Sequence, residues 1–217
     1  MFECILFDFD GTLMDTSEGI FESIGKVAEH YGVTLSTEQL RAFIGPPLKE
    51  SFPSIMGLPA SEVQNAIGIY RKHYAAGALF RSRVYDGIEA MLSHLKAAGR
   101  RLFVTTSKPE NFTKQILAQK GIAHFFQFVG GSDEDEKTRV EKADVIEYVL
   151  NAAQIADKRG ECLLAGDRCY DVAGAHAVGI KCAGVLWGFG SKDEMSAADF
   201  LVDTPDELER LVLCGSL

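Results

Sequence analysis

Short apolar runs alternate with segments of helical periodicity through most of this chain. Five runs predict strands, which are Cys4–Phe9, Leu102–Thr105, Phe125–Val129, Cys162–Ala165 and Cys182–Leu186. Nearly continuous apolar runs of this length are typical of parallel strands that helices cover on both faces. The segments between them place apolar residues on one helical face, as at Ile88, Met91, Leu92 and Leu95. The alternation predicts an α/β fold with a Rossmann-like, doubly wound parallel sheet.

One long stretch interrupts this alternation, because residues 14–82 contain no convincing strand run. Its apolar residues follow helical spacing, as at Ile20, Ile24, Val27 and Tyr31. Thr37–Phe43 and Ser61–Tyr74 also have the pattern of helices, and glycine and proline turns separate them. A chain of 217 residues exceeds one average domain of ~150 residues. We therefore expect a helical subdomain at 14–82, inserted into an α/β core made of residues 1–13 and 83–217.

The net charge and composition exclude several kinds of partner. Lys and Arg number 22 and Asp and Glu 31, which gives −9 at neutral pH. Such a chain repels phosphate backbones on average, so we expect no nucleic-acid polymer and no membrane as its partner. No apolar stretch approaches the ~20 residues that span a bilayer, and the first residues lack the basic start of a signal peptide. The five scattered cysteines lack metal-binding spacing and indicate reduced thiols in a cytoplasmic protein.

Two carboxylates end the first predicted strand. Asp8 and Asp10 stand two positions apart, so on a strand they would point the same way, and Gly11 then allows a sharp turn. Ligands of open α/β sheets bind outside the carboxyl ends of the strands, and buried charge is costly without a partner. The pair therefore indicates a binding site. Two other interpretations are a carboxylate that caps the turn and an EF-hand loop, although the twelfth position of such a loop would hold Gly19 instead of Glu.

A second pair of carboxylates, Asp167 and Asp171, follows the run Cys162–Ala165. The two stand four positions apart, so one helical turn could hold both near the same face. Alone, such a pair more often caps a helix than binds a metal. Together with Asp8 and Asp10 it forms an oxygen-rich cluster at neighbouring strand ends, and oxygen ligands suit Mg²⁺. The sequence thus predicts a magnesium site.

Two further segments offer groups that could bind anions, in contrast to the carboxylates above. Thr106 and Ser107 offer hydroxyls and helix-entry amides to phosphate oxygens, although Ser or Thr before a helix is more often only a cap. Lys142 opens a predicted helix, and a surface lysine is the default interpretation of such a residue. Arg139 and Lys137 are alternatives for the same role.

The order of these motifs resembles that of the haloacid dehalogenase-like superfamily, in its phosphatase branch. Four segments carry the resemblance: Asp8-Phe9-Asp10-Gly11-Thr12, Thr106, Lys142, and Gly166-Asp167 through Asp171. The helical insertion after the first motif is similar to the mobile cap of that family. Other segments resemble the phosphoglycolate phosphatase-like group, among them Tyr85-Asp86-Gly87-Ile88, Thr106-Ser107-Lys108-Pro109-Glu110 and Gly184-Val185-Leu186-Trp187-Gly188-Phe189-Gly190. The segment before Lys142 departs from the family pattern, because it lacks a glycine often found there.

The resemblance implies a phosphatase that forms an aspartyl-phosphate. Asp8 would be the nucleophile, and Asp10 would protonate the leaving alcohol and then activate water. Mg²⁺ would be held by the Asp8 carboxylate, the Asp10 backbone carbonyl and Asp167, and Asp171 would steady these ligands. The implied phosphoryl-binding residues are Gly11, Thr106, Ser107 and Lys142.

The implied substrate is one small phosphorylated metabolite, either phosphoglycolate-like or a nucleoside monophosphate, and the protein would be a monomer or homodimer. Arg41 and Lys49 in the helical insertion are candidates for binding an anionic tail of the substrate, although solvated surface charge is their default interpretation. A dehalogenase is disfavoured, because dehalogenases lack a second aspartate such as Asp10.

Three alternatives remain at the level of function. A phosphomutase of the same superfamily shares the Asp8 and Asp10 pair and transfers the phosphoryl group to a sugar. A phosphate- or metal-binding protein without catalysis belongs to another class, and the four intact motifs argue against it. A purely structural interaction protein would leave the clustered carboxylates without an explanation.

Overall fold

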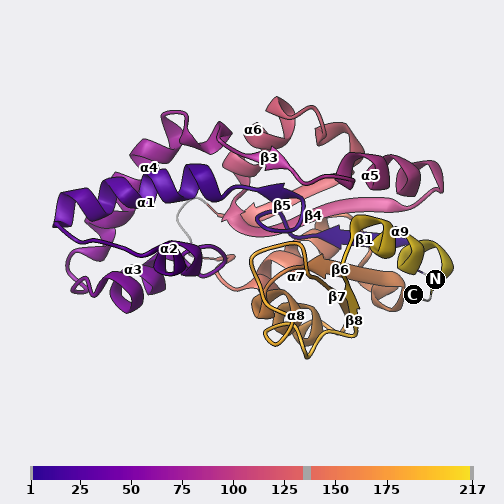
Figure 1. Ribbon diagram of the computed structural model, residues 1–217. Coiled ribbons are helices and arrows are strands. Elements are labelled where there is room, and N and C mark those ends of the chain that lie inside the picture. The colour runs from indigo at the N-terminus through magenta and orange to yellow at the C-terminus, as the bar shows by residue number, and fades with distance from the viewer. Residues whose placement is uncertain (1, 134–137, 216–217) are drawn as a thin grey trace. The chain divides into compact units, whose positions relative to one another are not determined.

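The computed structural model describes residues 2–133 and 138–215 (Figure 1). Their contacts divide the chain into two compact units. The first unit joins residues 1–14 to residues 84–217, and the second is the contiguous stretch 15–83. Each unit has its own buried core, so each is described by itself.

The first unit is built on a six-stranded sheet with the strand order β5-β4-β1-β6-β7-β8. The strands are β1 (Cys4–Phe7), β4 (Arg101–Pro109), β5 (Phe128–Ser132), β6 (Cys162–Gly166), β7 (Lys181–Val185) and β8 (Phe200–Val202). Every neighbouring pair is parallel. In the central strand, Leu6 pairs with Phe103 of β4 on one side and with Leu164 of β6 on the other. The predicted α/β fold with a parallel sheet is confirmed.

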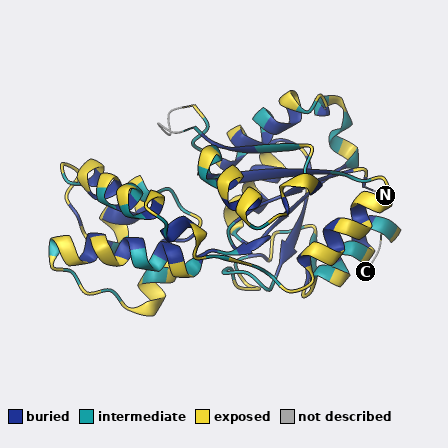
Figure 2. Ribbon diagram, turned by 90° about the horizontal axis from the view of Figure 1, so that it is seen from above, coloured by how far each residue is buried: buried dark blue, intermediate teal, exposed yellow. Residues whose placement is uncertain are grey.

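Helices cover both faces of this sheet, as continuous apolar strands require. The helices are α5 (Ile88–Ala97), α6 (Glu110–Gln119), α7 (Lys142–Ala152), α8 (Cys169–Ala177) and α9 (Pro205–Cys214). In Figure 1, α5 and α6 lie above the sheet and α7 and α8 below it. α7 packs on β4 and β5, α8 packs on β6 and β7, and α9 packs on α5. Figure 2 shows the strands as dark blue, buried ribbons between helices with yellow outer faces.

Several strand bounds differ from the predicted ones. β1 ends at Phe7 instead of Phe9, because the N–H groups of Leu13 and Met14 both donate to the Phe9 carbonyl and turn the chain. The run predicted from Phe125 begins as a strand only at Phe128, because the preceding residues form a short 3₁₀ helix, η2 (Ala123–Phe125). β4 continues to Pro109, past the predicted end at Thr105. β8 is not predicted, since three residues are too few to show a period.

The second unit is helical, with a short ribbon at its two ends. Its elements are α1 (Ser17–Tyr31), α2 (Thr37–Ala42), α3 (Leu48–Met56), α4 (Val63–Ala75) and η1 (Ala78–Phe80). α1 packs along α4, and α3 also packs on α4. The ribbon pairs β2 (Met14–Asp15) with β3 (Arg83–Val84), where the chain leaves and re-enters the first unit. Helix α3 is not predicted, because Pro53 within it argues against a helix.

A further 3₁₀ helix, η3 (Ala156–Glu161), precedes β6. Among the residues that the structure describes, no helix is both long enough and apolar enough to span a lipid bilayer.

Candidate active site

Asp8 is the first residue after the central strand. Its N–H donates to the Ala165 carbonyl at 2.8 Å, so the ladder with β6 continues one residue beyond β1. The tight turn that begins at Phe9 follows at once, and the Asp8 side chain is buried. The strand ladder on one side and the turn on the other therefore fix the direction of this carboxylate.

Asp167 occupies the equivalent place after β6 and is fully buried. Its Oδ1 accepts a hydrogen bond from the Thr12 hydroxyl at 3.3 Å, and its Oδ2 accepts one from the Phe189 N–H at 2.8 Å. Gly11 has φ +91°, and a Cβ there would overlap the Asp167 carboxylate. Glycine is thus required at position 11 both for its backbone conformation and for the close approach of Asp167.

Asp171 lies in the first turn of α8, whereas Asp167 precedes that helix. The sequence-based expectation that one helical turn holds both residues is therefore wrong, because α8 begins only at Cys169. Asp171 Oδ2 accepts the N–H of Arg168 at 3.0 Å and so caps the helix. Its Oδ1 lies 2.6 Å from the Nζ of Lys142.

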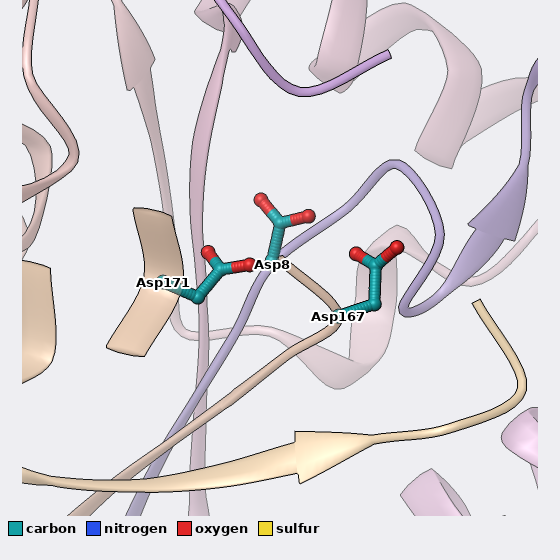
Figure 3. A group of neighbouring side chains, drawn as sticks. All are labelled: Asp8, Asp167 and Asp171. Atoms are coloured by element: carbon teal, nitrogen blue, oxygen red, sulfur yellow. The ribbon is translucent and has the colours of Figure 1, made fainter. Parts of the chain in front are cut away.

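Asp8, Asp167 and Asp171 form one cluster at this edge of the sheet. Oxygen atoms of the three carboxylates lie within 4.8 Å of one another, although Asp8 follows β1 and the other two lie between the end of β6 and the first turn of α8 (Figure 3). Lys142, the first residue of α7, places its Nζ 2.5 Å from Asp8 Oδ1. All four side chains are buried.

Burial dominates the electrostatics of this cluster. It raises the pKa of Asp8 to about 7, against the opposing effect of Lys142, and it raises the pKa of Asp167 well above its ordinary value. Burial alone would lower the pKa of Lys142, but Asp171 and Asp8 together raise it. The carboxylates are therefore short of positive charge, even with the lysine among them.

The side chain of Asp10 is directed to a different partner. Its Oδ2 lies 3.1 Å from the Nζ of Lys108, and the lysine side chain is 6% exposed and that of Asp10 14%. The Lys108 N–H donates to Thr106 Oγ1 at 3.1 Å. The buried Thr106 hydroxyl therefore accepts from the backbone and keeps its own proton to donate. Ser107 between them is partly buried.

The donor set of this site fits a divalent cation. With every group ionised, four carboxylates (Asp8, Asp10, Asp167 and Asp171) face two ammonium groups (Lys108 and Lys142), so two negative charges remain. The cluster offers only oxygen atoms, the ligand type that Mg²⁺, Ca²⁺ and Mn²⁺ accept. A cation of charge two would balance the excess and lower the raised pKa values.

This arrangement agrees with the result of comparison with known families. The sequence pattern of the family described as haloacid dehalogenase-like hydrolase matches residues 5–185, which include every residue of the cluster. The chain belongs to this family. As a haloacid dehalogenase-like hydrolase it is an enzyme, as the sequence predicts, and the predicted superfamily is confirmed.

Named relatives of this haloacid dehalogenase-like hydrolase include phosphatases. A 5'-nucleotidase of Pseudomonas aeruginosa is 37% identical over 194 residues, which cover 89% of this chain and 86% of that protein. A phosphoglycolate phosphatase of Xanthomonas campestris pv. campestris is 28% identical over 210 residues, 94% of this chain and 93% of that protein. The crystal structure of a predicted phosphatase from Clostridium acetobutylicum has a TM-score of 0.91 and 39% identity and covers 98% of this chain and 99% of that chain.

In this hydrolase, the structure distinguishes among the three basic residues that the sequence offers for binding the phosphoryl group, which are Lys142, Arg139 and Lys137. Lys142 reaches the cluster, whereas the Arg139 guanidinium donates to the Gly131 carbonyl at 2.8 Å and lies 4.2 Å from the ring centre of Tyr148. Lys137 lies outside the described residues. Arg41 on α2 and Lys49 on α3 are exposed side chains of the helical unit.

Four contacts in and around the site do not follow from the sequence pattern. Thr12 and Lys108 were part of recognised motifs, but no role was predicted for either side chain. The loop after β7 carries only a family resemblance in the sequence, yet its Phe189 N–H donates to Asp167. The Trp187 indole of the same loop donates to the Thr12 carbonyl at 3.0 Å. Its Gly188-Phe189-Gly190 sequence was the available signal, because paired glycines indicate close backbone approach.

Proposed function

We propose that this hydrolase is a magnesium-dependent phosphatase that cleaves a small phosphomonoester through an aspartyl-phosphate. One observation carries the proposal: a buried Asp8 carboxylate is paired with Lys142 and lies within 4.8 Å of two further carboxylates, while Asp10 two residues on is held apart by Lys108. Such a site separates a nucleophile from an acid–base group.

In the first half-reaction, a carboxylate oxygen of Asp8 attacks phosphorus. An Asp8 oxygen–phosphorus bond forms, the bond from phosphorus to the ester oxygen breaks, and Asp10 gives its proton to the leaving alcohol. Lys142 orients the Asp8 carboxylate through Oδ1. The Asp8 carboxylate is buried, which shields the nucleophile from bulk water.

In the second half-reaction, water attacks phosphorus. Asp10, now a carboxylate, takes a proton from that water, the Asp8 oxygen–phosphorus bond breaks, and inorganic phosphate leaves. Phosphoryl oxygens are bound by the Thr106 hydroxyl, the Lys142 ammonium, and the amides near Gly11 and Ser107. The Thr106 proton is available for this purpose, because the hydroxyl already accepts the Lys108 N–H.

Mg²⁺ would be held by Asp8 and Asp167, with the Asp10 backbone carbonyl as a third ligand and Asp171 steadying them. When bound, it supplies positive charge to the phosphoryl oxygens. The charge excess of the cluster and its oxygen-only donors support this assignment.

The substrate class we propose is a phosphoglycolate-like ester or a nucleoside monophosphate, in line with the names of two relatives. We propose residues 14–82 as a cap that restricts water, with Arg41 and Lys49 as candidates for binding an anionic tail. The cytoplasm is the proposed location.

The test is phosphate release from p-nitrophenyl phosphate and from a panel of phosphoglycolate and nucleoside monophosphates, with Mg²⁺ and with EDTA. We expect metal-dependent release, and acid-stable label from ³²P-ester on Asp8. Release that persists in EDTA would contradict the metal dependence. Transfer of the label to an added sugar phosphate instead of water would identify a phosphomutase, and no turnover of any ester would leave a binding protein.

A further inference from the structure

Lys108 is a buried lysine whose ammonium lies beside Asp10, the proposed acid–base group. Its side chain is 6% exposed, unlike those of most lysines of the chain, and its Nζ lies 3.1 Å from Asp10 Oδ2. Burying an ammonium is costly unless a charged partner compensates. The fold therefore places Lys108 beside Asp10 at a cost that a surface lysine would avoid.

A break in the strand pairing directs Lys108 inward. β4 pairs with β5 at Thr105–Gly130 and again at Pro109–Ser132, so residues 106–108 bulge opposite the single residue Gly131. A Cβ at Gly131 would lie only 2.5 Å from the Lys108 carbonyl oxygen, which makes glycine necessary for this bulge. Bulges next to active sites commonly redirect a side chain.

Lys108 thus contacts two residues of the proposed mechanism, Thr106 and Asp10. Its backbone N–H orients the Thr106 hydroxyl, and its ammonium holds the Asp10 carboxylate. Three other carboxylates lie nearby in the cluster, and like charge would push Asp10 away from them if Lys108 were neutral.

We propose that Lys108 is a positioning residue, whose ammonium holds the Asp10 side chain in place for proton exchange with the leaving alcohol and the attacking water. The inference rests on the proposed phosphatase mechanism. It extends that mechanism, because the nucleophile Asp8 is oriented by Lys142, and Asp10 requires a second lysine of its own.

The choice of leaving group distinguishes a positioning role of Lys108 from a role in binding the phosphoryl group. p-Nitrophenolate is a stable anion that leaves without a proton, whereas the alkoxide of an alkyl ester must be protonated. A misplaced Asp10 therefore spares the first half-reaction with p-nitrophenyl phosphate and slows the first half-reaction of an alkyl ester. The second half-reaction needs Asp10 as base with either ester, so it is slowed in both cases.

The experiment compares Lys108→Met, Lys108→Arg and the wild type, all with Mg²⁺. Methionine keeps the length of the side chain and removes the charge, and arginine restores the charge. Lys114→Met is the matched control, because Lys114 forms an exposed ion pair with Glu110 on α6. Single-turnover release of p-nitrophenolate, with enzyme in excess, measures the first half-reaction. Steady-state kcat and KM are measured with two substrates: p-nitrophenyl phosphate and the alkyl ester of the panel that is hydrolysed fastest. Thermal unfolding is followed for each variant.

For Lys108→Met we expect single-turnover p-nitrophenolate release within about 3-fold of the wild type and kcat for the alkyl ester lower by roughly 10–100-fold, with KM unchanged. With p-nitrophenyl phosphate, phosphorylated Asp8 should accumulate at steady state, because only its hydrolysis is slowed. Lys108→Arg should recover part of the lost rate. Lys114→Met should match the wild type.

Two outcomes would overturn the inference. Equal losses in single-turnover release and kcat, with a raised KM, would mean that Lys108 binds the phosphoryl group itself. Wild-type kinetics in Lys108→Met would mean that it has no role in turnover. If Lys108→Met is unfolded, the same comparison is made with Lys108→Arg. Its single-turnover release of p-nitrophenolate must then match the wild type, while its kcat for the alkyl ester lies below that of the wild type. A wild type without phosphorylated Asp8 would instead contradict the proposed function.

Discussion

The Nζ of Lys142 lies 2.5 Å from Oδ1 of Asp8, although the two residues stand 134 positions apart in the chain. The same nitrogen lies 2.6 Å from Asp171 Oδ1. One buried ammonium therefore pairs with two buried carboxylates. Asp167 beside them accepts hydrogen bonds from Thr12 and from the Phe189 N–H instead of an ion pair with this lysine. Removing any one member of this cluster should change activity and stability in a direction that the geometry predicts.

Asp8→Asn should abolish turnover. The amide keeps the size of the side chain but is no nucleophile, so kcat for p-nitrophenyl phosphate with Mg²⁺ should fall by at least ~10³-fold. The far-ultraviolet circular dichroism spectrum should stay unchanged. Asp157→Asn, at an exposed position, is the control and should keep wild-type activity. Activity of Asp8→Asn close to the wild type would contradict the nucleophile assignment.

Lys142→Met should destabilise the protein strongly. It leaves the buried Asp8 and Asp171 carboxylates without their cation, and breaking a buried pair in this way costs about 3–5 kcal/mol. Urea unfolding at pH 8 in EDTA measures the loss. Lys114→Met removes an exposed pair and should cost under about 1 kcal/mol. Equal losses in the two variants would show that the buried network adds no stability.

Asp167→Asn should stabilise the metal-free protein. Burial raises the pKa of Asp167, so its charged form is unfavourable in the folded state. The amide can accept from the Phe189 N–H and donate to the Thr12 hydroxyl, which preserves both contacts. We expect a gain of roughly 0.5–2 kcal/mol in EDTA at pH 8. Mg²⁺ should raise the melting temperature of the wild type and leave that of the variant unchanged.

The stability of the metal-free protein should depend on pH through Asp8. Burial raises its pKa from 3.8 to about 7, so between these values the folded state holds a proton that the unfolded chain releases. Stability contributed by the protonated form is therefore present below pH 4 and is lost as pH rises to 7. Asp8→Asn should exceed the wild type at pH 8 by a free energy on the order of 1–4 kcal/mol, and this gap should close toward pH 5. A gap that widens as pH falls would contradict the raised pKa.

Gly188→Ala should weaken metal binding from outside the cluster. An added Cβ would lie 2.5 Å from the Asp167 Cβ, so the loop after β7 or Asp167 must shift. Displacing a residue that supports a ligand commonly costs 10–100-fold in metal affinity. Titration of Mg²⁺ by the change in melting temperature measures the loss. Gly160→Ala has open space around it and should bind as the wild type does.

The carboxylates beside two strand ends were predictable from local pattern alone, although the exact bounds of several strands were not. The runs predicted as Cys4–Phe9 and Cys162–Ala165 end among carboxylates, and parallel strands bring such ends together at the carboxyl edge of the sheet. The helix that Lys142 opens was predictable for the same reason, because its apolar residues recur on one face. These features depend on residues close together in the sequence.

Contacts that depend on spatial neighbours were not predictable. The bulge that turns Lys108 toward Asp10 exists because Gly131 lies opposite it on another strand. The Thr12 hydroxyl reaches Asp167 from 155 positions away. Pro53 lowered the helical signal of α3, yet packing on α4 retains that helix.

The strand order of the sheet also determines at what stage of protein synthesis the active site can form. Both neighbours of β1 are later in the chain, so the first strand leaves the ribosome long before either partner. Asp171 follows Asp8 after a further 163 residues (171 − 8), which at ~5–20 residues per second takes roughly 8–33 s of synthesis. A nascent chain cannot assemble the acidic cluster in that time, and activity appears only when synthesis has passed α8.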